Sequence, residues 1–245
     1  MEIASYMVNL KTDDVDMPAF LARPEGEETY PAVIVIHEVF GLVQHIKDVA
    51  GRFAREGYLA IAPDLFFREG APGEDIDLPT IMRVIQELPD NRVVQDLKAT
   101  IAYLKDLKFV RRDKIGIIGF CMGGTYSLLM AGLSRELAAS AVFYGRIFYR
   151  EKSEKKPTAP IELVPQISCP LLLIYGEADM GIPMDDVRNL EESLRANGKG
   201  FELKTYPGAP HAFFNDTRET YRPEAAEDAW KRTLAFFDRH LKAGS

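Results

Sequence analysis

The chain has 245 residues, of which 47% are hydrophobic and 27% are charged, and its formal net charge is −7 at pH 7. These values predict one sizeable globular domain over residues 1–245, because α/β folds often exceed 200 residues without dividing. The acidic balance argues against nucleic acid or a membrane surface as a partner, since both favour a basic face. No segment is apolar for long enough to cross a bilayer.

The N-terminus and the cysteines bear on the cellular compartment. The opening residues, "MEIASYMVNLKTDD", lack a basic start followed by an apolar run, so we expect no signal peptide. Cys121 and Cys169 are the only cysteines, too few for a disulfide scaffold, which favours a reducing cytoplasm. The cysteines and the four histidines show no metal-ligand spacing, so we expect neither a metal nor another cofactor.

Strand and helix patterns alternate along the first half of the chain. The run "AVIVI" at 32–36 is apolar and rich in branched residues, as in a buried strand. Residues 90–106 predict a strongly amphipathic helix. The other predicted elements here are a helix at 45–57, a strand at 58–66, a surface loop at 68–80 and a helical patch at 81–88.

The second half continues the alternation. Strands are predicted at 114–120, 139–145, 170–176 and 201–208, and helices at 125–133, 184–198 and 226–241. The charged, proline-bearing segment 150–160 is interpreted as a solvated loop. Strands that alternate with helices predict an α/β fold, with a mostly parallel central sheet and helices on both faces.

Three acid–base-capable residues follow predicted strands, where the functional sites of parallel sheets lie. They are Cys121, Asp179 and His211, and their order of nucleophile, acid and histidine is that of α/β-hydrolases. The run "GFCMG" around Cys121 matches the nucleophile-elbow pattern, in which glycines avoid collisions at a strained strand-to-helix turn. The helix that follows favours the thiolate form of the cysteine.

Five motifs in order carry a resemblance to a known family. They are "HEVFGL", "GFCMGG", "FYG", "YGEADMGIP" and "PGAPHAF", at 37–42, 119–124, 143–145, 175–183 and 207–213. Over residues 20–240 the chain resembles the dienelactone hydrolase (carboxymethylenebutenolidase) family of the α/β-hydrolase fold. The resemblance implies a hydrolase of a small lactone or ester, with Cys121 as nucleophile, His211 as base and Asp179 as the orienting acid.

Glu38 follows the strand at which α/β-hydrolases build half of their oxyanion hole. In the family resembled, a glutamate at this place contacts the resting thiol and takes part in activating it, and burial would raise its pKa. A thiol kept neutral until substrate arrives is protected from oxidation. The backbone amides of Val39 and Met122 are expected to hold the oxyanion.

The family's substrate carries a carboxylate, so a cationic clamp is expected. An arginine that the resemblance predicts four residues after the catalytic histidine is replaced by Asn215. The candidates to take its place are Arg83, Arg146 and Arg218. Tyr144, His37 and Phe213 are further candidates for lining the substrate site.

Other interpretations of these residues stay open at this stage. Cys121 could be an inert core residue, Asp179 a helix cap, and Glu38 an ordinary loop carboxylate. His45 is interpreted as a surface residue of an early helix, and Cys169 as structural. The chain could accordingly be a carboxylesterase or thioesterase with a different substrate range, or a non-catalytic α/β-hydrolase-like protein that binds a small molecule. The expected partner is a small lactone or ester, and the expected state is a monomer or a small homo-oligomer.

Overall fold

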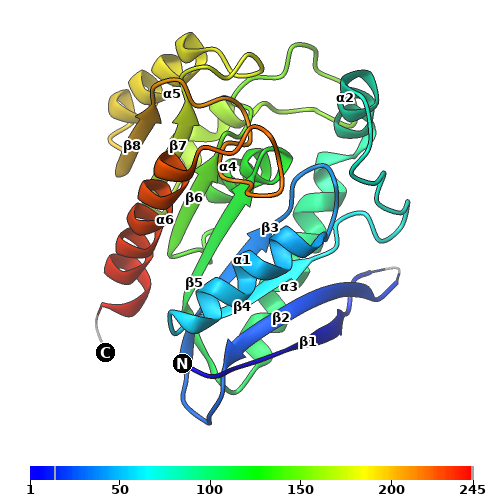
Figure 1. The fold of residues 1–245 in the computed structure, drawn as a ribbon, viewed down its shortest axis with the longest axis vertical. Coiled ribbons are helices and arrows are strands. Elements are labelled where there is room, and N and C mark those ends of the chain that lie inside the picture. Colours follow the sequence, from blue (N-terminus) through cyan, green and yellow to red (C-terminus); the bar gives the residue numbers. More distant parts are fainter. Residues whose placement is uncertain (14, 244–245) are drawn as a thin grey trace.

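A computed structural model describes residues 1–13 and 15–243. These residues form a twisted sheet of eight strands in the order β1-β2-β4-β3-β5-β6-β7-β8 (Figure 1). Only β2 runs against the others, since it pairs antiparallel with both β1 and β4. The strands are β1 (Ile3–Leu10), β2 (Met17–Pro24), β3 (Tyr30–Ile36), β4 (Leu59–Pro63), β5 (Val110–Phe120), β6 (Ala139–Phe143), β7 (Leu171–Gly176) and β8 (Phe201–Tyr206).

Helices cover both faces of this sheet, as the sequence predicts (Figure 1). The α-helices are α1 (Gln44–Arg55), α2 (Leu78–Glu87), α3 (Asp90–Asp106), α4 (Met122–Leu133), α5 (Met184–Ala196) and α6 (Pro223–Phe237). Helices α1 and α6 lie on one face, and α3 and α4 lie on the other. Helix α2 stands apart at the end of the sheet where the strands finish. No helix of the described residues is long and apolar enough to span a membrane.

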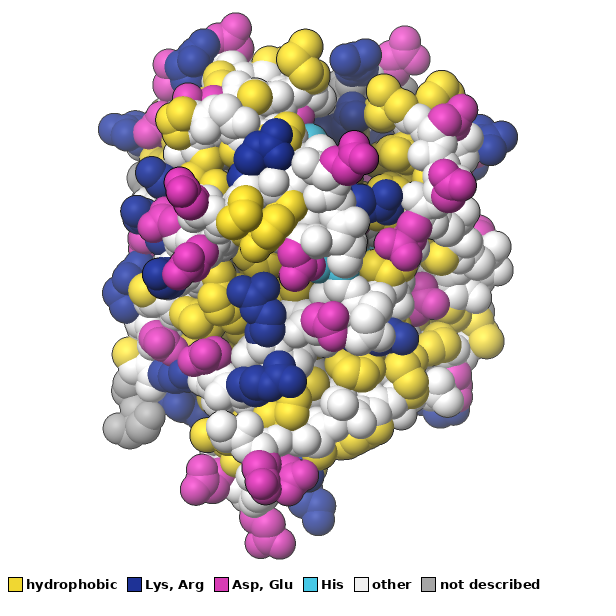
Figure 2. Space-filling view, in the orientation of Figure 1, with side chains coloured by type: hydrophobic (Ala, Val, Ile, Leu, Met, Phe, Trp, Pro, Cys, Tyr) yellow, Lys and Arg dark blue, Asp and Glu magenta, His cyan; other side chains and the backbone are white. Residues whose placement is uncertain are grey.

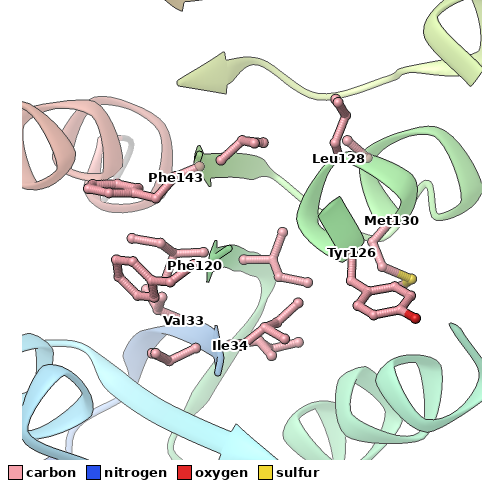
Figure 3. Packing of buried hydrophobic residues seen from close by; sticks show 14 of the residues in the cluster. Val33, Ile34, Phe120, Tyr126, Leu128, Met130 and Phe143 are labelled. Carbon is pink, nitrogen blue, oxygen red and sulfur yellow. The ribbon is translucent and has the colours of Figure 1, made fainter. Parts of the chain in front are cut away.

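The core sits between the sheet and its helices because the central strands are apolar on both sides. Every residue of β3 is buried, and so is every residue of β6. Phe120 and Phe143 end neighbouring strands with ring centroids 4.9 Å apart, while Tyr126 and Met130 extend from α4 (Figure 3). This packing holds the ends of β3, β5 and β6 in register, which fixes the loops that follow them.

The N-terminal strand pair β1–β2 is an element that the sequence pattern did not predict. β1 is an edge strand, and its middle residues, including Tyr6 and Met7, are exposed. Its side chains therefore lack a clean alternation of apolar and polar residues. β2 begins beside one proline and ends on another, Pro18 and Pro24, which also weakens a strand pattern.

Three further expectations need correction. Helix α4 begins at Met122, directly after the turn, rather than at 125. The last helix ends at Phe237, and the chain continues as a π-helical turn, Asp238–Lys242. The segment 150–160 is not wholly solvated, because Lys156 is buried and its Nζ lies 2.6 Å from Asp90 Oδ1.

Candidate active site

Cys121 occupies the turn between β5 and α4, with φ 55° and ψ −115°. This conformation is strained for a residue with a side chain, and such strain concentrates at functional sites. Only glycine fits around the turn. A Cβ on Gly119 would lie 2.0 Å from the carbonyl oxygen of Gly123, and one on Gly123 would lie 2.5 Å from that of Ile36. The turn therefore holds Cys121 at the end of β5 with the start of α4 directly after it.

The expected hydrogen bond between His211 and Asp179 is present, at 2.6 Å between Nδ1 and Oδ2. The other carboxylate oxygen, Oδ1, accepts from the amides of Gly181 at 2.8 Å and Ile182 at 3.1 Å. The Asp179 side chain is fully buried, so these bonds fix its orientation. A histidine that donates from Nδ1 leaves Nε2 free to accept a proton.

The pKa of His211 lies well above the ordinary histidine value. Burial lowers it, but the charge of Cys121 and hydrogen bonds with Asp179 and Cys121 raise it by more. The side chain is 36% exposed, so solvent screens part of this effect. His211 therefore lies between Asp179 and Cys121, and these three residues form the candidate acid–base chain of the site.

Glu38, in the loop after β3, is 1% exposed. Asn215 Nδ2 donates to its Oε2 at 2.6 Å, and its Oε1 has no hydrogen-bond partner in the described structure. Burial raises the pKa of Glu38, while His45, Asn215, His211 and, less strongly, Arg218 act in the opposite direction. A buried carboxyl with one unpaired oxygen is suited to hold or accept a proton.

Two backbone amides stand where an oxyanion hole is expected. The Val39 amide, beside Glu38, donates to no group of the described residues. Met122 is the first residue of α4, and the first amides of a helix have no partner inside it. Both residues line the same cavity as Cys121.

A cavity of about 890 Å³ connects these groups and opens beside α2 (Figure 2). Cys121, His211, Asp179, Glu38 and Tyr144 all contribute to its lining. Tyr144 is buried with φ 40°, and its hydroxyl makes no hydrogen bond of ordinary geometry within residues 1–13 and 15–243. Burial, followed by the charges of Glu38 and Cys121, raises the pKa of this tyrosine.

Three expected substrate contacts lie outside the cavity and are corrected. Arg83 is exposed and does not line it. Phe213 is buried behind Tyr144, with ring centroids 5.6 Å apart. His37 is buried, and burial lowers its pKa. Its Nδ1 donates to the carbonyl of Glu38 at 2.6 Å and its Nε2 accepts from the amide of Leu65 at 3.0 Å, so it supports the Glu38 loop.

The other two candidate arginines do line the cavity. Arg146 Nη2 lies 3.2 Å from Met82 Sδ, and its guanidinium has no carboxylate partner among the described residues. Arg218 stacks over the ring of Phe40 at 3.9 Å and donates to the carbonyl of Glu74 at 3.2 Å. Arg150, which the sequence did not single out, joins them in the lining.

His45 was wrongly expected at the surface, since it is buried in α1. Its Nδ1 lies 3.0 Å from Asp216 Oδ1, and its Nε2 has no partner in the described part of the chain. The next residue along, Ile46, is buried as well, so the buried face of α1 begins one residue earlier than its apolar pattern suggests.

Comparisons with known proteins bear on the family of this chain. Residues 17–241 match the model of a family described as "Dienelactone hydrolase family". A protein of Escherichia coli K12 named "Putative carboxymethylenebutenolidase" is 36% identical over 241 residues, covering 97% of this chain and 88% of that protein. A Bradyrhizobium protein named "Probable 2-oxo-3-(5-oxofuran-2-ylidene)propanoate lactonase" is 35% identical over 242 residues, and the match covers 98% of this chain and 96% of that protein.

A solved structure is similar over nearly the whole chain. It is a crystal structure from Klebsiella pneumoniae described as "Putative Dienelactone Hydrolase". It is 36% identical with a TM-score of 0.93, and the match covers 98% of this chain and 100% of the other.

Proposed function

The chain belongs to the dienelactone hydrolase family, and we propose that it hydrolyses a small carboxylate-bearing lactone or ester through an acyl-enzyme on Cys121. The observation that carries the proposal is the 2.6 Å bond between Asp179 and His211 in the cavity that also contains Cys121. A histidine held in one tautomer beside a strained nucleophile is the arrangement that acyl transfer needs.

In the first half of the reaction, His211 Nε2 takes the proton of the Cys121 thiol and the sulfur attacks the carbonyl carbon. The negative charge moves to the carbonyl oxygen, where the amides of Val39 and Met122 stabilise it. The carbonyl then re-forms, the carbon–oxygen bond of the ester breaks, and His211 returns its proton to the departing oxygen. With a lactone that oxygen stays attached to the acyl group, because the ring opens.

In the second half, His211 takes a proton from water, and the resulting hydroxide attacks the thioester. Collapse of this intermediate breaks the carbon–sulfur bond, releases the carboxylic acid and restores the thiol. Asp179 stabilises the imidazolium that forms in each half.

Glu38 controls when the thiol becomes reactive. Its unpaired Oε1 and raised pKa support a role as proton acceptor near the resting thiol. The Asn215 amide keeps the carboxyl in place without adding a positive charge, where the family resemblance predicts an arginine. A thiol that stays neutral between turnovers is protected from oxidation.

Arg146 is the best-supported anchor for the substrate carboxylate. It is half-buried, it lines the cavity, and its guanidinium lacks an anionic partner among the described residues. Arg218 is less free, because it already donates to Glu74. A carboxylate at Arg146 would gain charge-assisted hydrogen bonds.

The test is turnover of lactones and activated esters by Cys121→Ala, with Cys169→Ala as the matched control. Cys121→Ala should lose at least 10³-fold in kcat while keeping its Tm, and Cys169→Ala should keep its activity, because Cys169 lies away from the cavity. A substrate panel that includes lactones, simple esters and thioesters separates a lactonase from a carboxylesterase or thioesterase. Saturable binding without turnover would instead identify a binding protein.

A further inference from the structure

The cavity is larger than a small lactone requires. Its volume of about 890 Å³ lies near the upper end of the ~300–1,000 Å³ that accommodates drug-sized ligands. One wall is almost wholly apolar and comes from a single helix, α2. The side chains that form this wall, here called the α2 wall, are Leu78, Ile81, Met82 and Ile85.

The α2 wall is only partly covered, since Ile81 and Ile85 are half-buried against the core and Leu78 is largely exposed. Helix α2 contributes no fully buried residue to the core, although four of its ten residues are large and apolar on the cavity side. Leu78 is 68% exposed, and Met180, another residue of the cavity lining, is 95% exposed. Hydrophobic side chains gather around the hollow beside α2 in Figure 2. Contiguous apolar surface around a cavity marks a site for an apolar ligand.

Local contacts stabilise α2 at both of its ends. Asp77 caps the start of α2, since its Oδ1 accepts from the amide of Thr80 at 3.0 Å. Near its end, Glu87 forms an ion pair with Lys155. On the cavity side, Met82 contacts the guanidinium of Arg146. The apolar wall and the unpaired cation are therefore neighbours in one site.

We infer that the α2 wall binds an apolar chain attached to the ester that Cys121 attacks, so that the substrate is an amphiphilic ester with a hydrocarbon body and an anionic group at Arg146. This inference rests on the proposed hydrolytic function. From Leu78 to Ile85 the helix rises about 10 Å, which matches an extended hydrocarbon of about eight to nine carbons, because each bond of about 1.5 Å advances a zigzag chain by about 1.25 Å. Each methylene that reaches the wall leaves water and strengthens binding.

The experiment measures kcat/KM for p-nitrophenyl esters from acetate to decanoate, and for alkyl esters of one acid in the same range of lengths. One of the two series should rise about three- to fourfold per methylene and level off near eight carbons, where the wall ends. Which series rises identifies the side of the ester bond that lies along α2. Two flat series would overturn the inference.

Variants then locate the effect on the wall. Ile81→Ser and Leu78→Ser should each lower kcat/KM five- to tenfold more for the long ester than for the acetate, which is too short to reach along the wall. Leu78 is 68% exposed, so its replacement does not threaten folding. Arg83→Ser and Gln86→Ser, on α2 but outside the cavity lining, are the matched controls and should change neither rate. Equal losses on short and long esters would mean that the wall is only structural.

The two proposals fail in different ways. If Cys121→Ala keeps its activity, the proposed mechanism is wrong, whatever the chain-length profile. If Cys121→Ala is inactive and the wild type shows no preference for long chains, the inference about the α2 wall alone is wrong. Calorimetric binding of octanoate to Cys121→Ala gives a readout without turnover, and Leu78→Ser in that background should weaken it five- to tenfold.

Discussion

Replacing Asp179 with asparagine tests the acid–base chain because the structure dictates how the new amide must sit. Oδ1 of Asp179 accepts from two backbone amides, those of Gly181 and Ile182. An asparagine side chain can satisfy both only with its oxygen, so its NH₂ group must face His211 Nδ1. Two N–H groups cannot face each other, and Nδ1 must therefore become the acceptor. The proton then moves to Nε2, which can no longer take the proton of Cys121.

The expected loss for Asp179→Asn is about 10⁴-fold in kcat, which corresponds to about 5.5 kcal/mol of transition-state stabilisation. The substitution keeps the shape of the side chain and both amide hydrogen bonds, so Tm should fall by only a few degrees. The assay is steady-state hydrolysis of an activated ester together with thermal unfolding. Asp185→Asn, on the exposed start of α5, is the matched control and should retain full activity.

The same variant changes the pH dependence of stability. In the wild type the pKa of His211 is raised in the folded state, so its contribution is fully present below about pH 6.5, the unfolded value, and is lost as pH rises through the folded value. Asp179→Asn removes one of the causes and should flatten that fall. A variant that keeps more than a tenth of the wild-type kcat would refute the tautomer reasoning.

Three further predictions concern Glu38, Arg146 and Lys156. Glu38→Gln keeps the bond from Asn215 but cannot accept a proton, so kcat should fall at least 10²-fold with KM little changed. Because burial raises the pKa of Glu38, its own contribution to stability is lost as pH rises from about 4.5 through the folded value, so the variant should lose less stability over that range than the wild type. Arg146→Gln should raise KM about tenfold for a carboxylate-bearing ester and leave a neutral ester unaffected, both measured by steady-state kinetics. Lys156→Met removes the cationic partner of the buried Asp90 carboxylate, to which Tyr126 and Tyr149 still donate, and should lower the free energy of unfolding by about 3–5 kcal/mol in denaturant titration.

The sequence predicts the central parallel strands and the turn at Cys121 because both depend on local patterns. An uninterrupted apolar run means burial on both faces, and a cysteine between close glycines means a turn without room for side chains. Cys121, Asp179 and His211 each follow a parallel strand, so they lie together at the carboxyl ends of the strands. The edge strand β1 could not be predicted in this way, because much of it faces solvent and it lacks an uninterrupted apolar run.

Which residues face the cavity could not be predicted, because that depends on how α2 is rotated. Met82 and Arg83 are neighbours in the sequence, yet the first lines the cavity and the second faces solvent. Nothing in the local pattern distinguishes Arg83 from Arg146, which reaches the same region from the loop after β6. His37 directly follows β3 beside the site, but its ring nitrogens bond to the backbone of Glu38 and Leu65, so it supports the loop of Glu38.

On the proposed mechanism, the positions of the titratable groups explain how the Cys121 thiol can stay protonated at rest and still react when substrate binds. The charge of Cys121 is the first of the contributions that raise the pKa of His211, so His211 holds a proton most firmly when the sulfur is ionised. Glu38 is a further proton site in the cavity. Burial disfavours its ionised form, while the hydrogen bond from Asn215 and the charges of His211 and Arg218 favour it. A substrate that displaces water and brings its own carboxylate to Arg146 adds a negative charge to this network, which makes a second anion at Glu38 more costly. Substrate binding itself therefore shifts protons within the site on the proposed mechanism. If thiol attack depends on this shift, its rate should depend on the charge of the substrate as well as on the reactivity of its ester bond.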